Sequence, residues 1–121
     1  MKQLLYPQEI EVFYLIPAIR KAVAVQLKRQ GKGQKEIAEL LGITGAAVSQ
    51  YMSKKRASEI KFDDAILAEI EKSVDKIKEP MDSVRETQRI LNLIRQSKLI
   101  CQYHRKFTKG IPKNYCACFK K

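Results

Sequence analysis

The chain has 121 residues, enough for one compact domain and an appendage, and its 24 Lys and Arg against 13 Asp and Glu give a formal net charge of +11. No apolar run is long enough to span a bilayer and the start shows no signal-peptide pattern, so we expect a cytoplasmic protein without a membrane partner. Three cysteines, an odd number, do not make a disulfide framework.

Two helices are expected before residue 31. Pro7, followed by acidic residues, can open a brief helix, and we expect Pro17 to separate it from a stronger one over residues 18–30. Gly31, just past the end of that helix, fits a helix stop. The apolar stripe of the stronger helix consists of Ile16, Ile19, Val23 and Leu27.

Residues 34–56 predict two short helices joined by a tight turn. The first runs from Gln34 to Leu41, and Gly42 after it can adopt the positive φ that turns the chain. Thr44 is a good N-cap for the second helix, over residues 44–53. That helix places one set of residues at core-like spacing, Ala47, Val48, Tyr51 and Met52, and turns another set outward, Ala46, Ser49 and Gln50.

This pattern is typical of a helix-turn-helix, whose second helix enters the major groove of DNA. It resembles the Cro/repressor-like regulators of the xenobiotic-response-element family at seven positions, which are Gln34, Ala38, Gly42, Ile43, Val48, Ser49 and Tyr51. The resemblance implies an all-α, repressor-like core of four to five helices. The alternative is a helical hairpin that only packs, as in many bundles.

Two more helices are expected after this pair. Asp63 or Asp64 can cap a fourth helix that runs to about Glu79, where Pro80 stops it. A fifth begins at Met81 and reaches about residue 104; we favour a role in dimerisation over simple cover of the core. We therefore divide the chain into a DNA-binding domain over residues 1–80, this helix over 81–104, and a tail over 105–121. The apolar positions of the last two helices are Phe62, Ile66, Ile70, Val74 and Ile77, then Val84, Thr87, Leu91 and Ile94.

The positive charge is concentrated at two places. Residues 20–61 carry ten Lys and Arg against three Glu, residues 62–100 carry seven against eight acids, and residues 101–121 carry six and no acid. A polyanion such as double-stranded DNA is the natural partner of such a chain. A membrane surface fits less well, because no segment combines a strong apolar face with a basic cluster.

Ten residues are expected to contact DNA. Gln50 can pair with adenine, Ser49 can donate or accept a hydrogen bond, and the Ala46 methyl can touch that of thymine. The family resemblance implies that the Gln34 side chain holds a phosphate. The full set is Gln34, Lys35, Thr44, Gly45, Ala46, Ser49, Gln50, Lys54, Lys55 and Arg56.

The chain's only histidine and all of its cysteines gather near the C-terminus as Cys101, His104, Cys116 and Cys118. Three thiolates and one imidazole suit tetrahedral zinc, and an iron–sulfur cluster is the other possibility. The alternative is that the thiols are incidental. The whole chain resembles archaeal repressor-like regulators with a C-terminal cysteine cluster, which implies a metal or iron–sulfur site that is structural or sensory.

Together these patterns predict a homodimeric, sequence-specific transcription regulator that binds double-stranded DNA. No catalytic constellation is visible, so we do not expect an enzyme. The alternatives are a metal-binding protein that binds RNA, or a protein-interaction adaptor.

Overall fold

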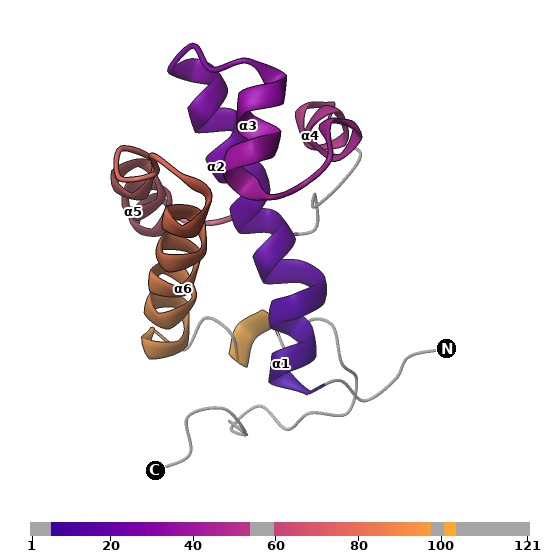
Figure 1. The fold of residues 1–121 in the computed structure, drawn as a ribbon. Coiled ribbons are helices and arrows are strands. Elements are labelled where there is room, and N and C mark those ends of the chain that lie inside the picture. Colours follow the sequence, from indigo (N-terminus) through magenta and orange to yellow (C-terminus); the bar gives the residue numbers. More distant parts are fainter. Residues whose placement is uncertain (1–5, 54–59, 98–100, 104–121) are drawn as a thin grey trace.

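The computed structural model describes residues 6–53, 60–97 and 101–103, and within these ranges the protein is all-α with no strand. No helix in the described ranges is long and apolar enough to cross a membrane. Figure 1 shows the arrangement, which consists of α1 (Pro7–Ile10), a π-helix (Glu11–Leu15), α2 (Ile16–Arg29), α3 (Gln34–Leu41), α4 (Gly45–Met52), α5 (Asp64–Val74) and α6 (Pro80–Gln96).

The N-terminal helices form one continuous rod, so the expectation that Pro17 separates two helices is wrong (Figure 1). A proline inside an α-helix lacks the N–H for its hydrogen bond, and its ring clashes with the carbonyl of the preceding turn. Here the preceding turn is the π-helix, in which the Ile16 N–H donates to the Glu11 carbonyl five residues back. This wider turn accommodates Pro17 near the start of α2. The end of α2 is as expected, with Gly31 at φ +96.

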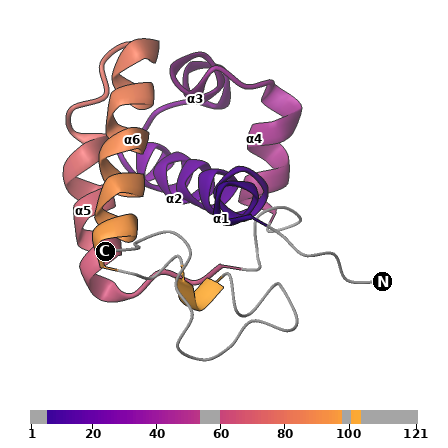
Figure 2. The ribbon, with the colours of Figure 1, turned by 90° about the horizontal axis from the view of Figure 1, so that it is seen from below.

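α2 is the central helix of the fold. Figures 1 and 2 show α3 and α4 on one side of it and α5 and α6 on the other, and α2 contacts all four. The expected stripe of α2 is buried at Ile19, Val23 and Leu27 and partly buried at Ile16. Each helix from α1 to α6 contributes to one apolar core. One core residue from each helix in turn is Ile10, Leu27, Ile37, Val48, Ile70 and Ile94.

α5 is shorter than expected and ends at Val74 rather than near Glu79. Its start is as predicted, because the Asp63 carboxylate accepts from the Ile66 N–H at 3.0 Å. At its end the N–H groups of Lys78 and Glu79 both donate to Asp82, at 3.0 and 3.1 Å, instead of continuing the helix. These bonds fix the turn into α6, where Pro80 occupies the first helical position.

α6 is also shorter than the helix expected up to residue 104, because it ends at Gln96 with Ser97 as its C-cap. Ile90, Leu91 and Ile94 are buried as predicted. The predicted stripe fails at its N-terminal end, where Val84 is 50% exposed.

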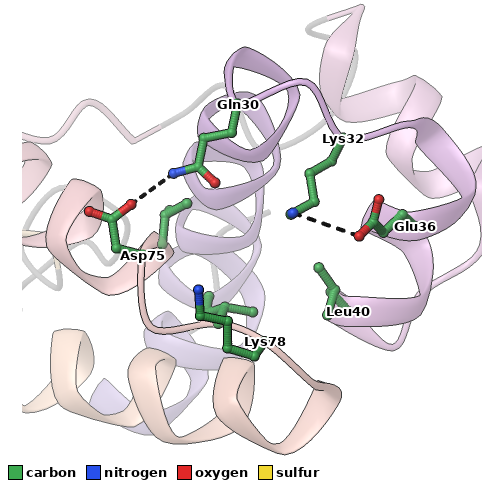
Figure 3. Close-up of a pocket in the computed structure, with 8 residues that line it drawn as sticks. Gln30, Lys32, Glu36, Leu40, Asp75 and Lys78 are labelled. Atoms are coloured by element: carbon green, nitrogen blue, oxygen red, sulfur yellow. Dashed lines mark hydrogen bonds and ion pairs between the residues drawn. The ribbon is translucent and has the colours of Figure 1, made fainter.

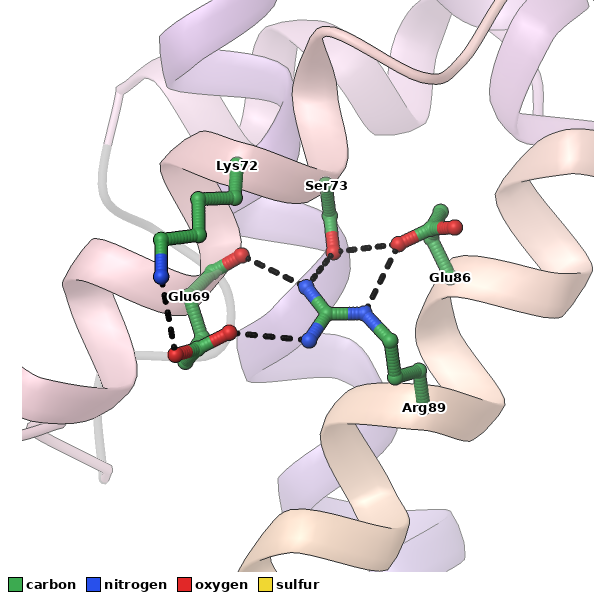
Figure 4. A network of polar contacts seen from close by, with 5 residues as sticks. All are labelled: Glu69, Lys72, Ser73, Glu86 and Arg89. Atoms are coloured by element: carbon green, nitrogen blue, oxygen red, sulfur yellow. Dashed lines mark hydrogen bonds and ion pairs between the residues drawn. The ribbon is translucent and has the colours of Figure 1, made fainter.

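A polar cluster fixes α6 against α5 (Figure 4). The Arg89 guanidinium donates to Glu69 at 2.8 Å and to the fully buried Ser73 hydroxyl at 2.7 Å, and it also pairs with Glu86 at 3.0 Å. Ser73 in turn donates to Glu86 at 2.7 Å. Hydrogen bonding to Arg89 lowers the pKa of Glu69. Burial would raise the pKa of Glu86, but hydrogen bonds from Ser73 and Arg89 outweigh it, so that pKa is also lowered.

Candidate nucleic-acid interface

α3 and α4 are joined by a three-residue turn that begins with Gly42. Gly42 adopts φ +67, a left-handed conformation that side chains disfavour, and its N–H closes the end of α3. The Ile43 N–H donates to the Ala38 carbonyl at 3.0 Å, and Ile43 packs against the core. The Thr44 hydroxyl then accepts from the Ala47 N–H at 3.0 Å and caps α4. The expected bounds of α3 and the expected cap of α4 are therefore confirmed.

α4 divides cleanly into a buried and an exposed face. Ala47, Val48 and Tyr51 are buried, with Val48 only 1% exposed, and α4 contacts both α2 and α3. Ala46, Ser49 and Gln50 are exposed, as the sequence predicts. The exposed face carries only short or uncharged polar side chains, so another molecule can approach this helix closely.

Gln34 connects the start of α3 to α4. Its amide nitrogen, Nε2, donates to the Gly45 carbonyl at 2.8 Å and to the Ser49 hydroxyl oxygen at 2.9 Å. A Cβ atom at Gly45 would lie 3.5 Å from this nitrogen, an ordinary contact distance, so the bond from Gln34 does not require a glycine at this position. The amide N–H groups of Gln34 are thus directed at α4, and a phosphate contact from them stays a prediction of the family resemblance.

This connection was not foreseen from the sequence. Gln34 lies in α3 and its partners lie in α4, so the periodicity within one helix does not predict the contact. No local sequence signal indicates it.

Backbone donors lie beside this connection. Gly33 precedes α3 and has no side chain to cap it, so the N–H groups of the first turn of α3 have no capping partner from that residue. Lys35 is exposed in the same turn and forms no ion pair within the described part of the chain. Lys32 pairs with Glu36 at 3.7 Å. The expected phosphate contacts at Lys54, Lys55 and Arg56 lie outside the described residues.

A pocket of about 330 Å³ lies where the end of α2, the start of α3 and the turn between α5 and α6 meet. Figure 3 shows the residues that line it. Gln30 donates to Asp75 at 2.9 Å, and the pair of Lys32 with Glu36 lines the other side. Because these polar groups already bind one another, we interpret the pocket as a gap between packed helices and not as a ligand site.

Of the four expected metal ligands, only Cys101 lies within the described residues, where it is 6% exposed and belongs to the core. His104, Cys116 and Cys118 lie outside them. Among the described residues, no group of three His, Cys, Asp or Glu side chains is arranged to hold a metal ion.

Comparison of the chain with models of known protein families, with curated proteins and with solved structures gives no match in any of the three.

Proposed function

We propose that the protein is a sequence-specific, double-stranded DNA-binding transcription regulator that places α4 in the major groove. The observation that carries the proposal is the division of α4, whose Val48 and Tyr51 face is buried while Ser49 and Gln50 are exposed. The major groove is about 12 Å wide and admits a helix. The small residues Gly45 and Ala46 leave this helix slender where it would meet base edges.

Charge supports the same proposal. The net charge of +11 favours a polyanionic partner, and one of its two concentrations, ten Lys and Arg against three Glu over residues 20–61, includes the α3–α4 pair. The Thr44 hydroxyl, Lys35 and the first N–H groups of α3 are donors for phosphate oxygens near α4, and Lys54, Lys55 and Arg56 follow α4 directly. Phosphate contacts set register and affinity, while the exposed side chains of α4 read the sequence.

RNA binding by base stacking is the rival function, and the aromatic side chains favour it less. Tyr51 of α4 is only 2% exposed and Phe62 is half-buried, so neither offers a stacking surface. Among the residues that the structure describes, the well-exposed aromatics are Tyr6, the N-cap of α1, and Phe13 of the π-helix. Both belong to the end of the rod that Figure 1 places away from α3.

We also propose that the protein binds DNA as a homodimer. A single reading helix contacts few base pairs, and paired half-sites about one helical turn apart are the usual remedy. Met81 and Val84, at 59% and 50% exposed, form an outward apolar pair at the start of α6. A second copy of the chain can cover this pair.

The C-terminal metal site is a further part of the proposal. Cys101 is buried and belongs to the apolar core, so a metal bound by Cys101, His104, Cys116 and Cys118 would tie the tail to the folded part. Zinc at such a site would be structural, and an iron–sulfur cluster would make it responsive to redox conditions.

The test is selection of binding sites from a random duplex DNA library, followed by measurement of affinity against salt concentration. We expect one enriched motif and a log–log salt slope that grows by about 0.9 for each phosphate neutralised. The double variant Ser49→Ala, Gln50→Ala should lose the motif, whereas Gln88→Ala on the exposed face of α6 should keep it. Preferential binding of structured RNA over duplex DNA would refute the proposal. Unchanged affinity and sequence preference in the double variant would instead indicate an interaction adaptor.

A further inference from the structure

We propose that the groove between α2 and α5 binds a small amphipathic carboxylate, with its apolar body along α2 and its carboxylate near Lys21 and Lys61. This α2–α5 groove has a volume of about 560 Å³, which lies within the range of small-molecule sites. α2 forms one wall, and α5 together with the preceding residues 60–62 forms the other. The site goes beyond the proposed function, because it needs no nucleic acid.

The floor of the α2–α5 groove is apolar. Ala18, Ala22 and Val25 of α2 are four and three positions apart, so they share one face of the helix. The two alanines are too small to fill the space beside them. Across the groove, Leu67 of α5 is 39% exposed and lines the same space. An apolar body placed here would remove Leu67 and the half-buried Val25 from water, which is favourable.

Positive side chains outnumber negative ones around the groove. Its basic lining residues are Lys21, Arg29 and Lys61, and Glu71 is the one acidic residue that the described chain contributes to it. None of these side chains forms an ion pair within the residues that the structure describes. Their charges are therefore available to a ligand, and an anionic group complements the groove.

The acidic side chain belongs to one end of the groove. Gln30 donates to Asp75 at 2.9 Å, so the end of α5 lies beside the end of α2. Glu71 stands one turn before Asp75, and Arg29 directly precedes Gln30. Glu71 therefore offsets the positive charge at the Arg29 end, which makes that end the less favourable place for a carboxylate.

The carboxylate is assigned to the other end of the groove. Lys21 stands eight residues before Arg29, about 12 Å away along the axis of α2. Lys61 precedes α5 and stands ten residues before Glu71. The carboxylate of Asp63, two residues after Lys61, is engaged as the N-cap of α5. Lysine side chains are long and flexible, so both lysines can reach one carboxylate.

Charge disfavours the other occupants of the groove. Residues 104–121 carry six Lys and Arg and no acid, and residues 54–59 carry three against one Glu. A second copy of the chain would bring a net charge of +11. Each of these would place like charges together, which is unfavourable. The phosphates of DNA would match the cations but would leave the apolar floor in water. A small molecule that joins an anionic group to an apolar body satisfies both features.

Calorimetric titration of the full-length protein with decanoate at neutral pH tests the site. We expect saturable binding of about one decanoate per chain. Acetate lacks the apolar body and decylammonium carries the opposite charge, so each should bind at least about 10-fold more weakly. Absence of decanoate binding up to about 1 mM overturns the proposal.

Charge variants test the position of the carboxylate. The double variant Lys21→Gln, Lys61→Gln should weaken decanoate binding about 10-fold, and Arg29→Gln should weaken it less than about 3-fold. The matched control Lys28→Gln, Lys76→Gln removes the same net charge from two exposed side chains that do not line the groove. Equal weakening in both double variants would indicate diffuse attraction to a basic protein and overturn the proposal. A larger loss in Arg29→Gln than in the Lys21, Lys61 variant would overturn the assigned position.

A size variant tests the apolar floor. Ala22→Leu fills the groove without a change in charge, and leucine is a good helix former, so α2 should stay folded. It should weaken decanoate binding about 10-fold. Ala68→Leu is the matched control, because Ala68 is exposed on α5 and does not line the groove. Circular dichroism of each variant checks the fold, and equal affinities in the two leucine variants would overturn the proposal.

Methyl NMR spectra of the wild type locate the ligand without any substitution. Decanoate should shift the signals of Val25, Leu67 and Ile70, which line the groove. Met81 and Val84 form the other exposed apolar pair and serve as the internal control. Shifts confined to that pair on α6 would place the ligand elsewhere and overturn the proposal.

Discussion

Arg95 binds Glu11 with both ends of its guanidinium, across 84 positions of sequence. Arg95 Nε lies 2.6 Å from Glu11 Oε2 and Nη2 lies 2.9 Å from Oε1. Glu11 is only 8% exposed and opens the π-helix, while Arg95 stands in the last turn of α6. Hydrogen bonding to Glu11 raises the pKa of Arg95, so the guanidinium is charged at neutral pH. This ion pair joins the N-terminal rod to the end of α6.

Removal of the arginine should therefore destabilise the fold. Arg95→Ala leaves the Glu11 carboxylate buried without its partner, and we expect a loss of about 2 kcal/mol in the free energy of unfolding. Urea unfolding measures it. Arg85→Ala is the matched control, because its pair with Asp82 is largely exposed on the Arg85 side and should contribute little. Equal losses in both variants would contradict a special role for the Glu11 pair.

Stability should fall in acid through the Arg89 cluster. The pKa values of Glu69 and Glu86 are lowered in the folded protein, so these carboxylates stabilise it above their ordinary value of 4.5. That contribution is lost as the pH falls through the folded values. The unfolding temperature of the wild type should drop below about pH 5, and Arg89→Ala should show a shallower drop. Arg85→Ala should keep most of the acid dependence, because the lowered pKa of Asp82 is caused first by the Lys78 backbone N–H and only in smaller part by Arg85.

Gly42→Ala should destabilise the α3–α4 pair without touching the proposed DNA contacts. A side chain at φ +67 costs about 1 kcal/mol, although no atom lies within 4 Å of the new Cβ to clash with it. The free energy of unfolding should fall by that amount, while DNA affinity of the folded variant stays at the wild-type level. Gly33→Ala is the matched control, since Gly33 has φ −81 and the same open surroundings. A similar loss at both positions would contradict the conformational explanation.

The proposed tail site predicts bound metal after anaerobic purification. Zinc at about one ion per chain in a colourless protein would support a structural site. Iron with sulfide and broad visible absorption that air bleaches would support a cluster. In either case Cys116→Ser should lower metal content. A protein without metal, in which all three thiols react with a thiol reagent after unfolding, would refute the site.

The proposed dimer predicts that charge on α6 lowers self-association. Val84→Glu places a carboxylate in the outward apolar pair, and light scattering should then show a shift from dimer toward monomer at equal concentration. Val12→Glu is the matched control, because Val12 is 57% exposed but lies on the π-helix. A wild-type protein that is monomeric both alone and on its selected DNA would contradict the dimer.

The helix ends that could be predicted from sequence to the residue, namely both ends of α3 and the N-cap of α4, are those whose signals are local. The bounds of α3 follow from its apolar spacing and from Gly42, and the start of α4 follows from Thr44, whose partner is three residues away. The exposed face of α4 was predictable for the same reason, because helical periodicity separates Val48 from Ser49. Such features depend on neighbours that are close in the chain.

Three other features could not be predicted, because each depends on which of several possible hydrogen-bond partners a backbone or side-chain group binds. Apolar spacing predicts that α5 continues past Val74, but Asp82 binds the backbone N–H groups that a longer helix would need. Proline chemistry predicts a break at Pro17, but the preceding turn widens instead. The bond from Gln34 to Ser49 joins two helices whose crossing no periodicity describes. The tail ligands lie outside the described residues and stay predictions.

The widened turn at residues 11–15 fixes the number of residues that the N-terminal rod can contain. Each residue of an α-helix turns the chain by about 100° around the axis. The π-helix carries one residue more than a regular turn, so everything before it is rotated by about that angle relative to an uninterrupted helix. Deleting one residue there would swing Ile10 out of the core and carry Glu11 away from Arg95. We expect the fold to tolerate substitutions in this segment, but not the insertion or deletion of a residue.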